Sequence, residues 1–223
     1  ATITTCTITG NSANYGCGIY CNYSSPTILN CNITGNIATS GNGGGIFCDN
    51  SSPSILNCNI TGNSAANNGG GIYSSESADS PVITNCIISG NNANNGGGIC
   101  CHDSFLTITN CNITGNTATT NGGGIYCYNS SPSITNNIIS GNTNHGIYVD
   151  SGSPIIDYND VWGNISGDCN RGTGTHGISS DPQFIGGGNY HLTSSSPCID
   201  AGSNSALPST ITTDLDGNLR IIG

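Results

Sequence analysis

The fold is decided by a stretch that reads Gly43-Gly44-Gly45-Ile46-Phe47-Cys48-Asp49-Asn50-Ser51-Ser52-Pro53-Ser54-Ile55-Leu56-Asn57-Cys58-Asn59-Ile60-Thr61-Gly62-Asn63. Its last six residues follow the pattern Cys-x-Ile-x-Gly-Asn. The pattern also begins at Cys6, Cys31, Cys86 and Cys111, and once more at Asn137 with asparagine in the cysteine position. The period is 25 to 28 residues. Periods of this length are typical of stacked repeats, in which each repeat buries its apolar face only against its neighbours.

Each repeat is predicted to form one turn of three short parallel strands. In the quoted stretch these strands are 46–48, 54–56 and 58–61. Side chains alternate between the two faces of a strand, so Ile46, Cys48, Ile55, Cys58 and Ile60 are expected to point inward. The sequence therefore predicts an all-β parallel solenoid of about six turns over residues 1–158, followed by an irregular C-terminal cap over residues 159–223.

Stacking of the turns at a spacing of about 4.8 Å places equivalent residues in columns. Two columns of isoleucine are expected to form the core: Ile19, Ile46, Ile72, Ile99, Ile125 and Ile147, and Ile33, Ile60, Ile88, Ile113 and Ile139. A column of asparagine is expected at a corner, because asparagine tolerates the unusual backbone angles there. Its members are Asn30, Asn57, Asn85, Asn110 and Asn136, and we expect their amides to hydrogen-bond from turn to turn.

Composition argues against several functional classes. Only 6% of the 223 residues are charged, there is no lysine, and the formal net charge is −10. The negative charge disfavours nucleic acid or an anionic membrane surface as a partner. No apolar run approaches the roughly 20 residues of a membrane span, so membrane insertion is not expected. The 13 cysteines lack the spacing of a zinc site and favour an extracellular, oxidising setting.

The cysteines of the repeats form two predicted inner columns. One contains Cys6, Cys31, Cys58, Cys86 and Cys111, and the other contains Cys21, Cys48, Cys101 and Cys127. Cysteine suits a narrow core as a small apolar residue. The alternative is a set of axial disulfides, because the strand spacing lies within the Cα separation that a disulfide allows. In the cap, Cys169 and Cys198 are predicted to form a disulfide.

An aromatic column is predicted on the outer face of the first strand of each turn. Its members are Tyr20, Phe47, Tyr73, Tyr126 and Tyr148, with Cys100 in the fourth turn. Stacking between strands would stabilise the solenoid. Alternatively, the column is a stripe that contacts sugars or proteins, because tyrosine suits half-wet interfaces. On another outer face, a column of Thr7, Asn32, Asn59 and Asn112 is interrupted by Ile87 and Ile138.

One segment near the end of the chain suggests a cation. Asp214, Asp216 and Asn218 place hard oxygen ligands at alternate positions, as at the start of a calcium loop. A structural calcium ion is one interpretation, and a turn capped by aspartate side chains is the other. No other cofactor is expected.

Two resemblances cover nearly the whole chain. The Gly-Gly-Gly-Ile repeats resemble those of right-handed parallel β-helix proteins of the polymorphic outer-membrane type. The motifs Asp181-Pro182-x-Phe184, Tyr190-His191-Leu192, Ser196-Pro197-Cys198-Ile199-Asp200-Ala201-Gly202 and Asp214-x-Asp216-Gly217-Asn218-x-Arg220 resemble a choice-of-anchor-like C-terminal module. Such modules follow β-helices in secreted and cell-surface proteins. The resemblance implies a right-handed helix and a location outside the cell or at its surface.

Enzymatic activity is not expected, although many parallel β-helices cleave polysaccharides. Such chemistry needs clustered carboxylates or a metal, and usually a basic residue. Both basic residues, Arg171 and Arg220, lie outside the repeats, and Asp49 and Asp150 are expected four turns, or about 19 Å, apart. We therefore expect a structural or adhesive protein. The alternative is a secreted protein that binds or cleaves polysaccharides, with glycans as its partners.

Self-association is the expected mode of action. Residue 1 aligns with Pro53 and so begins in mid-turn, which leaves strand edges without a partner. Either upstream sequence was removed or another copy covers this end, and head-to-tail stacking of copies would give a surface fibre. Residues Leu219-Arg220-Ile221-Ile222 are expected to form a strand that pairs with a neighbouring molecule.

Overall fold

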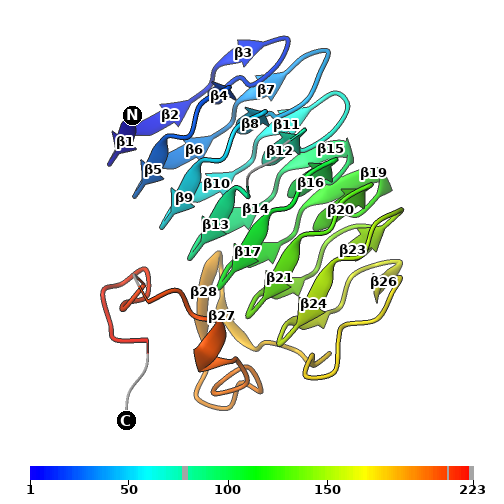
Figure 1. Cartoon of the computed structure of the whole chain (residues 1–223). Helices are drawn as coiled ribbons and strands as arrows, with labels where there is room; N and C mark the ends of the chain where they lie inside the picture. Colours follow the sequence, from blue (N-terminus) through cyan, green and yellow to red (C-terminus); the bar gives the residue numbers. More distant parts are fainter. Residues whose placement is uncertain (77–79, 210, 221–223) are drawn as a thin grey trace.

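The protein is a parallel β-solenoid of about six turns, with a non-repetitive segment at its C-terminal end (Figure 1). The computed structural model describes residues 1–76, 80–209 and 211–220. Among these residues there is no helix with the length and apolar character of a membrane span. Isoleucine and cysteine alternate with polar residues in the repeats, which is the period-two pattern that strands require.

Four parallel sheets run along the solenoid. Sheet A contains β1 (Thr2–Thr4), β5 (Thr27–Leu29), β9 (Ser54–Leu56), β13 (Val82–Thr84), β17 (Thr107–Thr109), β21 (Ser133–Thr135) and β24 (Ile155–Asp157). Sheet B contains β2 (Thr7–Thr9), β6 (Asn32–Thr34), β10 (Asn59–Thr61), β14 (Ile87–Ser89), β18 (Asn112–Thr114), β22 (Ile138–Ser140) and β25 (Asp160–Trp162).

The other two sheets complete each turn. Sheet C contains β3 (Ser12–Ala13), β7 (Ile37–Ala38), β11 (Ser64–Ala65), β15 (Asn92–Asn95) and β19 (Thr117–Asn121). Sheet D contains β4 (Ile19–Asn22), β8 (Ile46–Asp49), β12 (Ile72–Ser75), β16 (Ile99–His102), β20 (Ile125–Tyr128), β23 (His145–Val149) and β26 (Gly167–Cys169). The three predicted strands per turn are confirmed, and sheet C adds a further short strand that was not predicted.

The apolar core follows the predicted columns. Equivalent isoleucines pair in register from turn to turn, for example Ile60 with Ile33 and Ile88. From the second turn to the fifth, these isoleucines are completely buried. In the first turn, Ile3 and Ile8 only pack against the edge of the core and remain partly exposed.

The corner between sheets A and B is the predicted asparagine corner. Its residues have positive φ in every turn, from 53° to 58°: Thr5, Asn30, Asn57, Asn85, Asn110, Asn136 and Tyr158. The expected amide stacking is confirmed for one pair, since Asn85 Nδ2 donates to Asn57 Oδ1 at 2.7 Å. Asn136 instead bonds the C-terminal segment.

A second asparagine column, which was not predicted, lies inside the solenoid. The backbone N–H and Nδ2 of Asn91 both donate to Asn116 Oδ1, at 3.0 and 2.9 Å, and Nδ2 also donates to the Ile60 carbonyl at 2.9 Å. The same bonds repeat in each turn, so that each amide satisfies buried backbone groups. The members are Asn11, Asn36, Asn63, Asn91, Asn116, Asn142 and Asn164.

All 13 cysteines belong to the described residues and all are free thiols. Neither the axial disulfides nor the predicted disulfide between Cys169 and Cys198 is present. Cys169 packs against the end of the apolar core, whereas the Cys198 thiol donates to Asp160 Oδ2 at 3.0 Å. Each of these thiols is thus held by a different part of the solenoid.

The column from Cys31 to Cys111 serves as a hydrogen-bonding corner. The Cys58 thiol donates to the Leu56 carbonyl at 3.2 Å, and its sulfur accepts the Cys31 backbone N–H at 3.5 Å. Asn137 occupies the same position in a later turn and also donates to the carbonyl two residues before it, at 3.1 Å. The cysteines therefore act as small buried residues. Burial raises the pKa of Cys86 and Cys100 well above that of an ordinary thiol.

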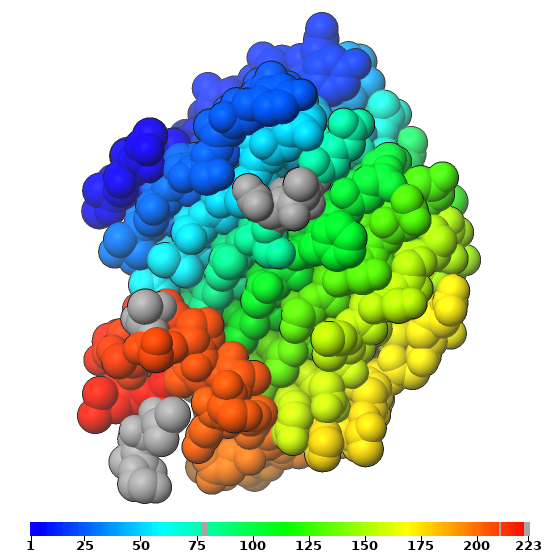
Figure 2. Space-filling view, in the orientation of Figure 1, coloured from blue at the N-terminus to red at the C-terminus, as the bar shows by residue number. Residues whose placement is uncertain are grey.

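The segment after β26 folds back along the solenoid. It contains an antiparallel hairpin of β27 (Phe184–Gly186) and β28 (Asn189–Leu192) and a single 3-10 turn, η1 (Asn204–Ala206). In Figure 1 it lies beside β13, β17 and β21, and in Figure 2 it protrudes from the side of the rod. We call residues 170–220 the C-terminal segment. Parallel strands continue as far as Cys169, and an isolated parallel bridge joins Asp160 to Ile178. The division into two domains at residue 158 stays a prediction.

The predicted strand at the end of the chain is described only in part, since Ile221 and Ile222 lie outside the described residues. Leu219 forms an antiparallel bridge with Thr213, and the Arg220 backbone N–H donates to the Thr212 carbonyl at 3.0 Å. The described half of this strand therefore pairs on one side within its own chain, and its pairing with a neighbouring molecule stays a prediction.

Candidate functional site

The outer face of sheet D carries a continuous ladder of rings. Tyr20 packs against Phe47 at an interplanar angle of 41° with centroids 5.1 Å apart, Phe47 meets Tyr73 edge-on at 4.9 Å, and Tyr73 lies 6.2 Å from His102. His102 in turn stacks on Tyr128 at 4.9 Å. The break in the column at Cys100 was predicted, but the ring that fills it was not. His102, two residues further along the same strand, supplies the ring of that turn.

A second pair of rings continues the predicted column. Tyr126 and Tyr148 pair in register and stack with centroids 6.1 Å apart. Burial, with a further contribution from the charge of Asp150, raises the pKa of Tyr126 to about 12. The hydroxyl therefore stays protonated and remains a hydrogen-bond donor at any physiological pH.

The middle of the predicted contact stripe is not accessible. Phe47 and Tyr73 are 9% and 6% exposed and form a small apolar cluster with fully buried Cys100. For these two residues, burial favours the first alternative, in which stacked rings stabilise the sheet, over a contact stripe. The ends of the ladder remain open, with Tyr20 50% and Tyr128 41% exposed. Neighbouring exposed rings are Tyr15, Tyr23 and Phe105.

The acidic side chains of sheet D lie beside these rings. The Tyr20 hydroxyl donates to Asp49 Oδ2 at 3.2 Å, and His102 Nδ1 lies 2.8 Å from Asp103 Oδ2. Among the described residues, no three histidine, cysteine, aspartate or glutamate side chains lie close enough together to hold a metal ion. The face thus offers rings with hydrogen-bonding edges, which suits contact with another molecule.

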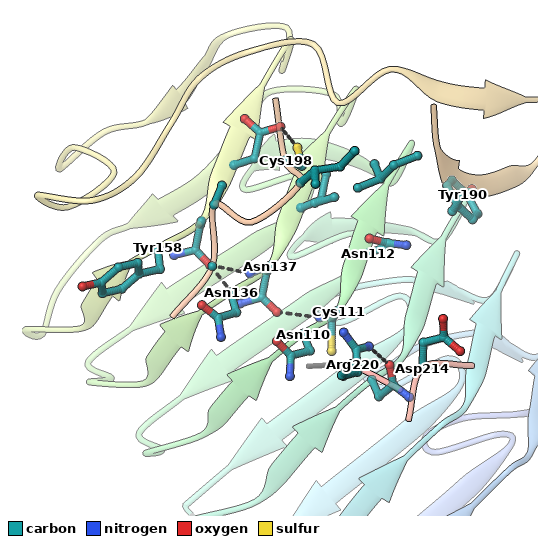
Figure 3. Close-up of a pocket in the computed structure, with 18 of the residues that line it drawn as sticks. Asn110, Cys111, Asn112, Asn136, Asn137, Tyr158, Tyr190, Cys198, Asp214 and Arg220 are labelled. Carbon is teal, nitrogen blue, oxygen red and sulfur yellow. Dashed lines mark hydrogen bonds between the residues drawn. The ribbon is translucent and has the colours of Figure 1, made fainter. Parts of the chain in front are cut away.

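A groove of about 990 Å³ separates the C-terminal segment from the asparagine corner and sheet B (Figure 3). Its floor comprises the asparagine corner and the outer face of sheet B, at Ile87, Asn112 and Ile138. Its far wall includes Tyr190, and its rim includes Asp214. The groove explains why isoleucine interrupts the polar column of sheet B. Both isoleucines lie where the C-terminal segment covers the solenoid, and this was the signal in the sequence for its position.

The C-terminal segment crosses the asparagine corner twice. Asn136 Nδ2 donates to the Ser203 carbonyl at 2.9 Å, and Asn136 Oδ1 accepts the Ser203 backbone N–H at 2.8 Å. Two turns away, Arg220 Nη2 donates to Asn85 Oδ1. Between the crossings, Asn110 remains on the groove floor, and its Nδ2 is buried without a hydrogen-bond partner.

Two contacts near the last turn hold the start of the segment. Buried Asp160 accepts the Cys198 thiol and, at 3.1 Å, the Ser180 backbone N–H. Burial is the main cause that raises the pKa of Asp160, and burial together with the Asp160 carboxylate raises the pKa of Cys198 to about 12. Further along, His176 stacks on Tyr158 with centroids 4.4 Å apart.

The predicted calcium ligands form an aspartate-capped turn. Asp214 Oδ1 accepts the backbone N–H groups of Asp216 and Asn218 at 2.9 and 2.8 Å, and Asp214 Oδ2 accepts Asn218 Nδ2 at 3.1 Å. Asp216 is paired with His191. The hydrogen bonds of this turn therefore already use the Asp214 oxygens that would bind a cation, and they lower its pKa.

Comparison with known proteins agrees with this architecture. A family model described as the right handed beta helix region matches residues 17–184, which is more than half of the chain. No curated protein and no solved structure matches the chain. The polymorphic outer-membrane type and the C-terminal cell-surface module remain resemblances of sequence. On its repeats, its parallel sheets and this match, the chain belongs to the right-handed β-helix family.

Proposed function

We propose that the chain is a non-catalytic structural or adhesive protein of the cell exterior that acts by associating with further copies of itself. The observation that carries the proposal is the ring ladder of sheet D, whose exposed ends, Tyr20 and Tyr128, lie among further exposed rings. Aromatic residues that are rigid, amphipathic and clustered on a surface are typical of protein contact sites.

In this proposal, end-to-end contact uses the strands of the first turn. Within the described residues, β1, β2, β3 and β4 each pair on one side only. An unpaired edge accepts another parallel strand, and Ile3 and Ile8 offer apolar surface beside it. Such an edge pairs equally well with a preceding turn of a longer chain or with a second copy. We propose that a second copy supplies the strands that pair with it.

The distribution of the acidic side chains favours a non-catalytic role. The acids of sheet D and its following turn, among them Asp49 and Asp103, are paired with a tyrosine hydroxyl and a histidine. Most glycoside hydrolases use two carboxyl groups that face one scissile bond at about 5 to 10 Å from each other. Asp49 and Asp103 instead bind the rings of Tyr20 and His102, which supports a role in holding these rings in place.

Sedimentation velocity over a range of protein concentrations tests the proposal. The wild-type protein is expected to form larger species as its concentration rises. The double variant Tyr20→Ser, Tyr128→Ser should reduce lateral association, while Ile165→Ser, which removes an exposed apolar side chain elsewhere, should not. The double variant Ile3→Lys, Ile8→Lys should block end-to-end association, because it charges the end of the core.

The variant Thr2→Lys, Thr7→Lys is the control for the added charge, because both side chains point outward on exposed positions of the same strands. Uniform wild-type monomers at every concentration would contradict the proposal. Association that survives both double variants would show that neither surface mediates it.

A further inference from the structure

We propose that Asn121 is a site of spontaneous deamidation, at which the following glycine and water convert the side-chain amide into a carboxylate. The chain contains the sequence Asn-Gly-Gly-Gly four times, beginning at Asn42, Asn68, Asn95 and Asn121. Asn121 ends β19 in sheet C, whereas the ring ladder proposed for self-association lies on sheet D. The two proposals therefore concern different surfaces and can fail independently.

The reaction at an Asn-Gly pair needs two groups to be free. The glycine backbone nitrogen attacks the side-chain carbon Cγ of the asparagine and loses its proton, and the side-chain nitrogen leaves as ammonia. Water then opens the resulting succinimide ring and gives aspartate or isoaspartate, so that one water is consumed and one ammonia is released. Glycine has no Cβ to hinder the attack. A hydrogen bond that holds the backbone N–H or the side-chain amide must break first, which slows the reaction.

The attacking nitrogen is held by a hydrogen bond in three of the four pairs. In each of them the glycine N–H donates to the asparagine carbonyl of the next turn at 3.0 Å. These bonds join Gly43 to Asn68, Gly69 to Asn95 and Gly96 to Asn121. Within the part of the chain that the structure describes, the Gly122 N–H donates to no carbonyl. The fourth pair therefore lacks the bond that protects the other three.

A shorter sixth turn explains the missing bond. Asn116 is aligned with Asn142, and Ile125 with Ile147, in the fifth and sixth turns. Nine positions separate these residues in the fifth turn but only five in the sixth. The sixth turn thus adds no strand to sheet C, and β19 is the last strand of that sheet (Figure 1). The carbonyl that would accept the Gly122 N–H is not supplied.

The side chains of the same asparagines form a ladder that stops before Asn121. Asn42 Oδ1 accepts the Asn68 backbone N–H at 3.0 Å and Asn68 Nδ2 at 3.2 Å, and Asn95 Nδ2 donates to Asn68 Oδ1 at 3.0 Å. Asn95 Oδ1, the next acceptor, is buried without a partner in the described structure. The pairing of β15 with β19 is irregular between Ala93 and Asn95, and the Asn121 amide makes no hydrogen bond to any described residue. Its side chain is therefore free to turn towards Gly122.

Exposure does not distinguish the four pairs. Each of the four asparagines is half-buried, and each of the four glycines that follow them is buried. The sequence around the reacting bond is also the same. Hydrogen bonding is thus the difference that the structure shows between Asn121 and the other three sites, and it selects Asn121 through both reacting groups.

Deamidation would place a charge on a neutral face of the solenoid. The five strands of sheet C contain no charged residue. Conversion of Asn121 would make the formal net charge of −10 one unit more negative. Isoaspartate would also lengthen the backbone by one carbon. Because β19 pairs only with β15, this change would disturb the end of one sheet and leave the apolar core intact.

Peptide mapping of aged protein by mass spectrometry tests the proposal. Chymotrypsin cleaves after phenylalanine, tyrosine and leucine, which places the four pairs on separate peptides, 30–47, 57–73, 74–105 and 107–126. The folded protein is incubated in mildly alkaline buffer, and tandem spectra assign the conversion to each asparagine. Conversion at Asn121 should be at least about tenfold faster than at Asn42, Asn68 or Asn95. Isoaspartate at Asn121 should be detected by methylation with an isoaspartyl methyltransferase.

Unfolding and a matched pair of variants provide the controls. In guanidinium, all four pairs should react at the same rate, because their local sequences are identical and the fold no longer protects three of them. Asn121→Ser should abolish the early conversion in the folded protein. Asn42→Ser makes the same change in the same motif three turns away and should leave the rate at Asn121 unchanged. Circular dichroism confirms that both variants are folded.

Two results would overturn the proposal. The first is conversion at Asn42, Asn68 or Asn95 that is as fast as conversion at Asn121 in the folded protein. The second is an Asn121 that stays unmodified in the folded protein over a period in which the denatured protein converts at all four pairs.

Discussion

The solenoid and the C-terminal segment are held together in different ways. In the solenoid, each turn repeats the same buried isoleucines and the same buried asparagine bonds, so stability is spread over many equal contacts. After Cys169, the described segment buries only Pro182, Ser196 and Ile211, and it meets the solenoid through a few polar contacts. One chain thus combines a rod that is stabilised by repeated contacts with a segment that is attached through a few contacts that do not repeat.

The contrast also assigns roles to the two regions. A rod whose side chains are fully buried and in register is suited to fixed spacing of surface groups. A segment that touches the rod at isolated points leaves space between them, and that space is the groove. The following predictions test this contrast, beginning with the largest expected effect.

Loss of one buried amide should destabilise the solenoid most. Asn91→Ala would remove the acceptor of the Asn63 backbone N–H and side-chain amide, together with the side-chain donor to the Ile60 carbonyl and Asn116. Because each unsatisfied buried group costs about 1 to 3 kcal/mol, the free energy of unfolding should fall by about 4 kcal/mol. Guanidinium denaturation followed by circular dichroism measures it. Asn92→Ala, at the exposed neighbouring position, should change it by less than about 0.5 kcal/mol.

Truncation of an isoleucine separates the two regions directly. Ile113 is completely buried, so Ile113→Ala should cost about 3 kcal/mol through lost burial and the cavity that remains. Ile185 in the hairpin is 61% exposed, and Ile185→Ala should cost less than about 0.5 kcal/mol. Equal losses in the same denaturation experiment would show that the segment has a core of its own.

Removal of the Asn136 amide should release the segment without unfolding the rod. Asn136→Gly tolerates the positive φ of 58° but loses both hydrogen bonds to Ser203. Amide hydrogen exchange around residues 198–207 should become faster, by a factor that corresponds to about 1 to 2 kcal/mol. Protection of sheets A and B should not change. Asn110→Gly, whose amide contacts no part of the segment, should leave exchange there at the wild-type rate.

Attachment of the segment should depend weakly on pH. Burial raises the pKa of Asp160, so its neutral form is favoured in the folded state. This contribution is fully present below the ordinary aspartate pKa of about 3.9 and is lost as pH rises through the raised value. Protection of the backbone near Cys198 should therefore decrease as pH rises above about 4.

The variant Asp160→Asn should remove this pH dependence. Asp157 provides the opposite trend as an internal control, because the hydrogen bond from His176 lowers its pKa. Its contribution is present above the ordinary aspartate pKa and is lost as pH falls through the lowered value. Protection that rises steadily with pH in the wild-type protein would contradict the assignment to Asp160.

The sequence predicted the solenoid because its signals are local and repeated. The isoleucine columns, the three main strands and the positive-φ corner follow from alternation and from asparagine at one fixed position. The inner asparagine ladder was equally visible in the sequence, because Gly-Asn recurs in every repeat. Gly-Asn is also typical of exposed turns, so burial of the asparagine was not predicted. The ring of His102 was not predicted because His102 lies two residues after Cys100, the position that belongs to the expected column.

The groove was not predictable from the same signals. Its crossings join residues 67 and 135 positions apart, and no period relates Ser203 or Arg220 to the corner that they contact. The interruption of a polar column by Ile87 and Ile138 was the one trace of this contact in the repeats. The prediction of a Cys169–Cys198 disulfide was wrong for a similar reason, since the pairing of cysteines depends on positions that only the fold determines.

The most direct test of the central claim, that this β-helix acts by associating with copies of itself, is cryo-electron microscopy of the untreated natural protein. The account predicts filaments or ordered oligomers in which the first-turn edge or the ring face of sheet D lies at the contact between copies. Uniformly dispersed monomers with both surfaces open to solvent would contradict it.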